Sequence, residues 1–120
     1  MDLIAAVDPA VDDDEEAVAA LARRLRAELL DLDVAAVEPV PAEAAPAGTK
    51  GLAALLGTLA VKLGPAALKA VVAKIRDWAS RNGRSVEVTL DGDTIKLTGA
   101  TTEQQELLLN AWLARHAAGA

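Results

Sequence analysis

Apolar and polar residues follow regular spacings that divide the first third of the chain into three elements. The apolar run Leu3–Val7 predicts a first strand. Apolar residues then recur every three or four positions, which predicts a helix over about residues 12–32 with one apolar stripe. The stripe consists of Val18, Leu21, Leu25, Leu29 and Leu32. Residues Val34–Val40 predict a second strand, and a strand–helix–strand unit of this length usually has parallel strands.

The middle of the chain has long apolar segments that are broken once. The stretch 41–49 contains prolines among small residues and predicts a flexible linker. Gly51–Val61 and Ala66–Asn82 predict two helices, or one helix kinked at Pro65. Within residues 51–76, basic residues are spaced seven apart, which predicts an amphipathic helix with a basic polar face. One basic strip holds Lys62, Lys69 and Arg76, and an adjacent strip holds Lys74 and Arg81.

The last third reads as a hairpin followed by a helix. Ser85–Leu90 and Thr94–Thr98 alternate with period two around the turn sequence Asp91-Gly92-Asp93. The positions expected to face the core are Val86, Val88, Leu90, Ile95 and Leu97. Thr101 or Thr102 is expected to cap the final helix. The buried stripe of that helix is expected to contain Leu108, Leu109, Trp112 and Leu113.

These elements predict a single α+β domain over residues 1–120. The expected architecture has two layers, with a mixed sheet of about four strands and helices on one face. The expected order is β-α-β-α(α)-β-β-α. The order of the strands within the sheet does not follow from the sequence.

Composition removes several functional classes. The chain has 120 residues, no Cys, one His, and two Trp as its only aromatic residues among Phe, Tyr and Trp. Disulfide scaffolds, thiolate nucleophiles, Cys-based metal sites and multi-histidine metal sites are therefore excluded. A net charge of -6 and the lack of aromatic stacking residues argue against a nucleic-acid partner.

The net charge is an average over two unlike regions. Residues 1–16 hold seven carboxylates and no Lys or Arg, whereas residues 50–84 hold seven Lys or Arg and one acid, Asp77. This asymmetry can join the two regions within one molecule, or join the acidic end of one copy to the basic helix of another. It therefore indicates association with a protein partner, a homo-oligomer, or an anionic membrane surface.

No group of residues carries a pattern that predicts catalysis. The acids Asp12–Glu16 lack the alternation and glycine of a calcium loop and fit a solvated helix start. Asp91 and Asp93 fit a turn, and His116 has no acid or Ser pattern around it. We therefore expect no enzyme, no cofactor and no metal. Trp78 and Trp112 are expected to be core or interface anchors.

The order of these features resembles the effector-associated constant components of bacterial conflict systems, which are common in actinobacteria. The resemblance covers nearly the whole chain, and its best-matching positions are Trp78–Arg81 and the hairpin that follows. It implies a non-enzymatic, cytoplasmic adaptor in antiviral defence or programmed cell death that recruits an effector, such as a caspase-like peptidase or an NTPase-linked protein. Lys62 and Lys69 interrupt a middle block that is more continuously apolar in many relatives.

Two functions follow as expectations. In the first, the chain binds an effector protein through a set of residues on the basic helix. This set is Lys62, Lys69, Lys74, Arg76, Trp78 and Arg81. In the second, the chain is peripheral at the membrane and segment 51–76 inserts as an oligomer, because three lysines make a single span unfavourable. The absence of a signal-like start at Met1–Ile4 leads us to expect a cytoplasmic protein.

Overall fold

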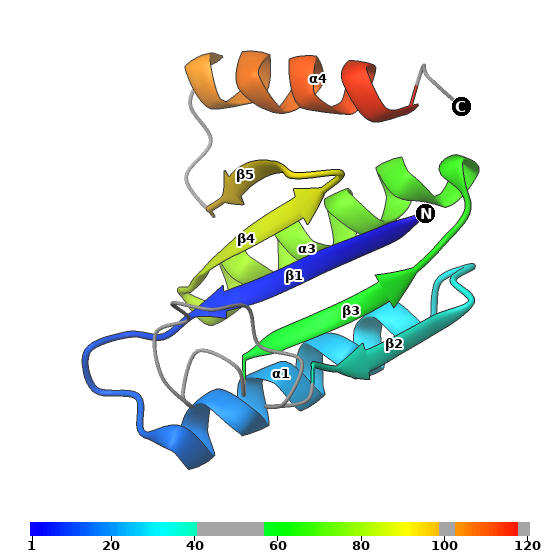
Figure 1. Cartoon of the computed structure of the whole chain (residues 1–120). Helices are drawn as coiled ribbons and strands as arrows, with labels where there is room; N and C mark the ends of the chain where they lie inside the picture. The colour runs from blue at the N-terminus through cyan, green and yellow to red at the C-terminus, as the bar shows by residue number, and fades with distance from the viewer. Residues whose placement is uncertain (41–56, 99–102, 118–120) are drawn as a thin grey trace.

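The protein folds as an α+β structure built on a five-stranded sheet, seen in a computed structural model that describes residues 1–40, 57–98 and 103–117 (Figure 1). The strands are β1 (Asp2–Asp8), β2 (Ala36–Pro39), β3 (Thr58–Lys62), β4 (Ser85–Leu90) and β5 (Asp93–Leu97). They lie in the order β2-β3-β1-β4-β5, and every neighbouring pair is antiparallel. The predicted α+β class is confirmed.

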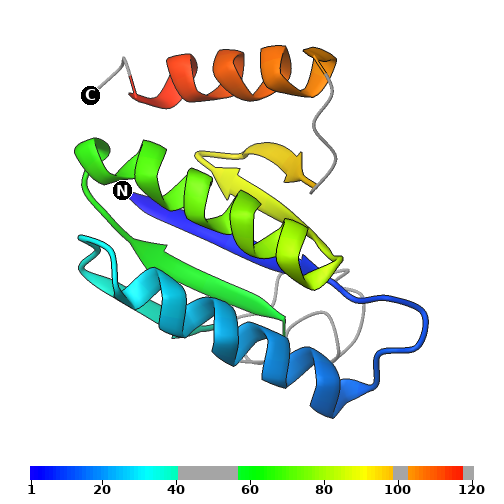
Figure 2. The same ribbon diagram turned by 180° about the vertical axis from the view of Figure 1, so that it is seen from behind.

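Two helices cover one face of this sheet, and a third packs beside them. The described helices are α1 (Glu15–Leu30), α3 (Leu68–Asn82), α4 (Glu103–Ala117) and a short 3₁₀ turn, η2 (Pro65–Ala67). Figure 2 shows α1 and α3 lying across the sheet, with α4 alongside α3. The linker at 41–49, the first part of the helix expected at 51–61, and the cap at Thr101 or Thr102 lie outside the described residues.

The main correction concerns Thr58–Lys62, which forms a strand and not part of a helix. Leu59 and Val61 are buried, while the residues between and beside them are not. This two-residue period is too short to stand out within an Ala- and Leu-rich segment that also has high helix propensity. Pairing on both edges, with β1 and β2, decides the conformation here.

The extra strand also changes the topology of the sheet. β3 lies between β1 and β2, so these two strands run in parallel, as expected, but are not neighbours. The sheet is therefore antiparallel rather than mixed. β1-α1-β2 and β3-α3-β4 are two interleaved split β-α-β units, the connectivity of a ferredoxin-like arrangement. β5 and α4 extend this arrangement at one edge of the sheet (Figure 1).

Alternation along each strand places the core between the sheet and the helices. Ala5 of β1 lies opposite Leu59 of β3 and Val88 of β4, and all three are buried. The hairpin residues predicted to face the core do so, with Ile95 only partly buried. From α3 the core receives Leu68, Val71, Val72, Ile75, Trp78 and Ala79.

The turn predictions are confirmed by the backbone. Asp91 and Gly92 both have positive φ, at 53° and 79°, as a two-residue hairpin turn requires. Gly83 has a φ of 62° and ends α3 in the left-handed conformation that glycine adopts without strain. Both turns are therefore fixed by local sequence.

The buried stripe of α4 differs from the expected one at a single position. Leu109 and Trp112 are buried and Leu113 is partly buried, but Leu108 is exposed. α4 carries leucine at three consecutive positions, 107–109, so periodicity alone leaves the orientation of the helix open. Packing of α4 against α3 and η2 places Leu109 in the core cluster.

Candidate interaction surface

The six residues predicted to bind a partner do not share one helix face. Lys62 is the last residue of β3, and Val61 beside it points into the core. Because side chains alternate along a strand, Lys62 points to the sheet face opposite the helices, next to Asp2 in the register. The predicted strip of Lys62, Lys69 and Arg76 is therefore wrong at Lys62. The other five residues lie on α3.

On α3, the two basic strips lie on opposite flanks of one exposed ridge. We call the exposed residues Ala70, Ala73, Asp77 and Ser80 the α3 ridge. Helical geometry places Lys69 and Arg76 on one side of the ridge, toward α4. It places Lys74 and Arg81 on the other side, toward α1. The strips expected to be adjacent are thus separated by a row of mostly small residues.

The flank toward α4 borders a groove of about 440 Å³ between the two helices. Lys69 and Arg76 line it from α3, and Glu106 and Asn110 line it from α4. Arg76 donates a hydrogen bond to Glu106, and this pairing lowers the pKa of the Glu106 carboxyl. Lys69 is exposed and forms no ion pair with any described residue. This flank therefore holds one compensated and one uncompensated positive charge.

The flank toward α1 has the same division of charge. Arg81 donates hydrogen bonds to Glu28 of α1 and to Asp77 one turn earlier, and the pKa of its guanidinium is raised by these two bonds. Lys74 is half-buried and, like Lys69, forms no ion pair within the described part of the chain. Among the described residues, the cations near the ridge that have no ion-pair partner are therefore Lys69 and Lys74, one on each side.

Trp78 takes no part in this surface. Its side chain is fully buried beneath α3, which confirms a core position for this tryptophan. The indole Nε1 is buried without a hydrogen-bond partner among the described residues. An unpaired buried donor costs about 1–3 kcal/mol. The volume of the ring, and not its polar atom, therefore accounts for its place in the core.

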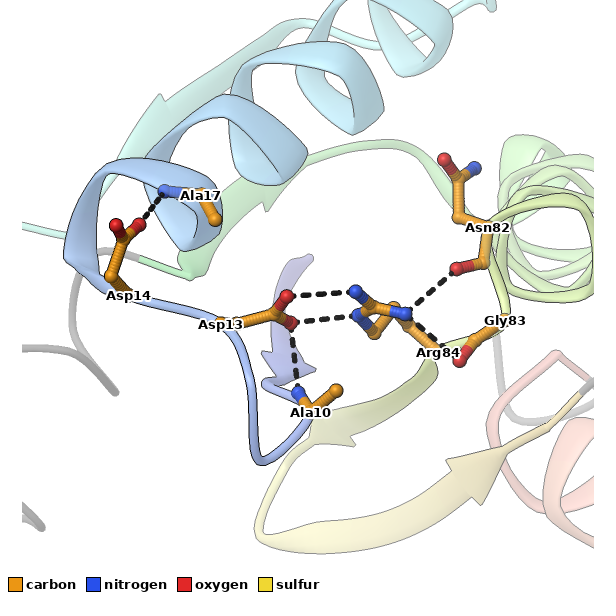
Figure 3. Close-up of polar contacts among 7 residues, drawn as sticks. All are labelled: Ala10, Asp13, Asp14, Ala17, Asn82, Gly83 and Arg84. Atoms are coloured by element: carbon orange, nitrogen blue, oxygen red, sulfur yellow. Dashed lines mark hydrogen bonds and ion pairs between the residues drawn. The ribbon is translucent and has the colours of Figure 1, made fainter.

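The acidic start of the chain meets the basic block within one molecule through Asp13 and Arg84 (Figure 3). Both carboxylate oxygens of Asp13 accept hydrogen bonds from the Arg84 guanidinium, each at 2.8 Å. Asp13 also accepts a bond from the Ala10 amide, and Arg84 donates to the carbonyls of Asn82 and Gly83. The bonds from Arg84 hold the pKa of Asp13 below its ordinary value.

This Asp13–Arg84 clamp is structural rather than open to a ligand. It fastens the loop before α1 to the turn between α3 and β4, and the Asp13 side chain is only 8% exposed. The next acid, Asp14, accepts a hydrogen bond from the Ala17 amide and caps α1. The acidic run thus contains the solvated helix start that its sequence predicts, together with one ion pair between residues far apart in the chain, which the sequence does not reveal.

A second polar cluster, which sequence reasoning missed, fixes α4 to the hairpin turn. The Asp93 carboxylate contacts Arg115 Nε and His116 Nε2, each at 2.8 Å, while the Asp93 carbonyl accepts a bond from Trp112 Nε1. Arg115 and then His116 lower the pKa of the Asp93 carboxyl. The partners are about twenty residues apart in sequence, so only the i, i+3 and i+4 spacing of Trp112, Arg115 and His116 hinted that they share one end of α4.

Two other kinds of site are absent from the described ranges. No three His, Asp or Glu side chains gather there in a way that could hold a metal ion. No helix among the described residues is long and apolar enough to cross a membrane. Comparison with protein-family models, curated proteins and solved structures finds no match to this chain.

Proposed function

We propose that the chain is an adaptor that binds an effector protein through the α3 ridge and its two free lysines. The observation that carries this proposal is the pair Lys69 and Lys74, which flank the ridge without an ion-pair partner in the described structure. The resemblance to effector-associated constant components supplies the class of partner, a peptidase or an NTPase-linked protein of a bacterial conflict system.

The shape of the ridge supports a helical partner with an acidic edge. Ala70 and Ala73 are exposed and have short side chains, so a second helix can approach the α3 backbone closely. Lys69 and Lys74 on either side then reach carboxylates of the partner. Complementary charges at the rim of an interface mainly raise the association rate and fix orientation, and their effect weakens with salt.

The membrane-active alternative requires a rearrangement of this fold. The segment 51–76 includes β3, which lies between β1 and β2, and Leu59 and Val61 are buried there. Release of those two side chains costs about 1.5–3 kcal/mol each. Insertion therefore needs a trigger that takes β3 out of the sheet, whereas protein binding through α3 needs none.

Affinity capture from the native host tests the adaptor proposal. The full chain is used as bait, and captured proteins are quantified by mass spectrometry for wild type and for the double variant K69E/K74E. We expect a peptidase or an NTPase-linked protein to be enriched with wild type and lost with the double variant. Because Lys69 is exposed and Lys74 is only half-buried, the variant should fold normally, which circular dichroism verifies.

The matched control is Lys62→Glu, which reverses one free surface lysine on the opposite face of the sheet. It should capture the same partner as wild type. Loss of the partner with Lys62→Glu, or its retention with K69E/K74E, would place the binding surface elsewhere. Recovery of neither class of effector by wild type would contradict the adaptor function itself.

A further inference from the structure

The side of α4 that faces away from the domain is unusually apolar for a solvent-facing helix. Leu107 is 65% exposed on this side, and Ala111 and Ala114 are exposed there as well, whereas Leu108 lies on the flank toward β5 and lines a hollow of about 350 Å³ with Ile95 and Leu97. The inward side is already occupied by Leu109 and Trp112. A helix that is apolar on both sides is typical of one that is covered on both sides. In both ribbon views α4 forms a border of the molecule (Figures 1 and 2).

The outer face is also complementary to itself when two copies of α4 run antiparallel. Consider an antiparallel pair whose two-fold axis crosses the outer face at the level of residue 109 along the helix. Residues at equal distances on either side of that level then face each other, so residue 107 of one helix faces residue 111 of the other. Leu107 then fits against Ala111, and Gln104 lies beside Ala114. Leucine opposite alanine is the pairing of large and small side chains that lets helices pack closely.

Charge agrees with the same arrangement. In this register Glu103 of one copy meets Arg115 of the other, and the contact occurs twice by symmetry. Glu103 is exposed and has no ion-pair partner among the described residues. Arg115 contacts Asp93 through Nε only and its side chain is 55% exposed, so its terminal nitrogens remain available. A parallel pair would instead place Glu103 beside Glu103 and Arg115 beside Arg115.

We propose that the outer face of α4 is the interface of a homodimer, in which two copies of the chain pair through antiparallel α4 helices. The occupant is a second copy of this chain because apolar fit and charge are both satisfied by the same residues on both sides. A pair of helices buries less area than a standard protein interface, so a reversible dimer of modest affinity is expected. The α3 ridge lies on another helix and stays open in the dimer.

Sedimentation equilibrium of the full chain over a range of concentrations tests the dimer. Wild type should show a monomer–dimer equilibrium, and Leu107→Glu should raise the dissociation constant about tenfold or more, because symmetry places two carboxylates in the apolar centre of the interface. Leu30→Glu is the matched control, since Leu30 is a 45% exposed leucine on α1. It should dimerise as wild type does.

Disulfide trapping tests the antiparallel register, and the absence of native cysteine makes the result simple to interpret. A mixture of Gln104→Cys and Ala114→Cys chains should form cross-linked dimers, whereas Gln104→Cys alone should not. In the proposed register two copies of residue 104 are separated by about ten residues along the helix, or about 15 Å. A disulfide needs Cα atoms within about 7 Å.

Each of the remaining outcomes overturns the proposal. A wild-type chain that is monomeric at every concentration has no such interface. A dimer that Leu107→Glu leaves intact uses another surface, as does one that Leu30→Glu dissociates. Equal cross-linking of Gln104→Cys alone and of the mixture excludes the antiparallel pair. None of these results bears on effector binding, because the capture experiment depends on Lys69 and Lys74 and this one on α4.

Discussion

Helices α3 and α4 have the same length, 15 residues, but are held in the protein by different forces. α3 buries six apolar side chains against the sheet, including the whole of Trp78. α4 buries two, Leu109 and Trp112, and depends on polar contacts at the Asp93 turn and at Arg76. Burial of apolar area dominates folding energy, whereas exposed ion pairs contribute little. α3 is therefore part of the core, and α4 is an attachment to it.

The difference explains how the two helices expose different surfaces. The large apolar residues of α3 lie on its buried side, so its exposed side consists of alanine, serine and charged side chains. α4 has leucine on both sides and so presents Leu107 and Leu108. A strongly amphipathic helix gives a polar surface that suits a charged partner, whereas a weakly amphipathic one leaves an apolar surface that suits close packing.

Truncation of the two tryptophans should have the largest effect and should distinguish α3 from α4. Trp78→Ala should lower the free energy of unfolding by about 3–5 kcal/mol, because the cavity lies in the core. Trp112→Ala removes the same side chain from a helix that can detach, so it should cost the whole protein less. Urea denaturation measures both losses. Hydrogen exchange should show loss of protection only over residues 103–117 in Trp112→Ala.

An equal decrease in the free energy of unfolding of the two tryptophan variants would mean that α4 belongs to the same cooperative unit as α3. A loss of protection throughout the sheet in Trp112→Ala would mean the same. Either result would contradict the description of α4 as an attachment, and would raise the expected effect of every substitution on its inner side.

Two neighbouring leucines of α4 differ in burial, and their truncation should differ in cost. Leu109→Ala should cost about 2 kcal/mol or more, because its side chain packs against the core cluster. Leu108→Ala should change stability by less than about 0.5 kcal/mol, because that side chain is mainly in solvent. The sequence expectation placed both leucines in the buried stripe. Equal costs for the two variants in thermal or urea unfolding would support that expectation against the observed orientation.

The smallest expected effect is the pH dependence of α4. Arg115 and His116 lower the pKa of Asp93 in the folded state. The stability that the ionised carboxylate adds to the folded state is therefore present above the ordinary Asp pKa of about 3.9, and it is lost as pH falls through the lowered pKa. Protection of the α4 amides should therefore decrease below about pH 4 relative to that of the α3 amides. Asp93→Asn should weaken α4 at neutral pH and reduce this dependence.

Asp91→Asn is the control for the pH experiment, since Asp91 belongs to the same turn, is exposed, and forms no hydrogen bond or ion pair with α4 among the described residues. Asparagine tolerates the positive φ found there. A variant at position 91 that changes α4 as much as Asp93→Asn does would show that turn geometry, and not the carboxylate, holds the helix.

Much of the fold followed from local signals. The α1 stripe, the hairpin with its Asp91-Gly92 turn, and the stop of α3 at Gly83 all agree with expectation, since each depends on residues close in sequence. The sequence did not predict strand β3, because its five residues have no clear preference for strand or helix and take their conformation from pairing with β1 and β2. Because the sequence predicted a helix over Gly51–Val61, the antiparallel sheet and the split β-α-β connectivity could not be predicted either.

The candidate surface followed only in part, for the same reason. Spacing correctly paired Lys69 with Arg76 and Lys74 with Arg81, because both pairs lie on a real helix. It wrongly added Lys62, because the seven-residue spacing there crosses from a strand into a helix. It also could not tell which cations have partners, since Glu106 and Glu28 reach Arg76 and Arg81 from other helices.

The amino-acid sequence alone was enough for the α+β class, for the contrast in charge between residues 1–16 and residues 50–84, and for the turns, because these depend on composition and on neighbours in the chain. Tertiary contacts make Thr58–Lys62 a strand, leave Lys69 and Lys74 without an ion pair among the described residues, and turn Leu109 inward while Leu108 stays exposed. Those choices depend on residues far apart in sequence, and their energies exist only once the sheet and helices are in contact.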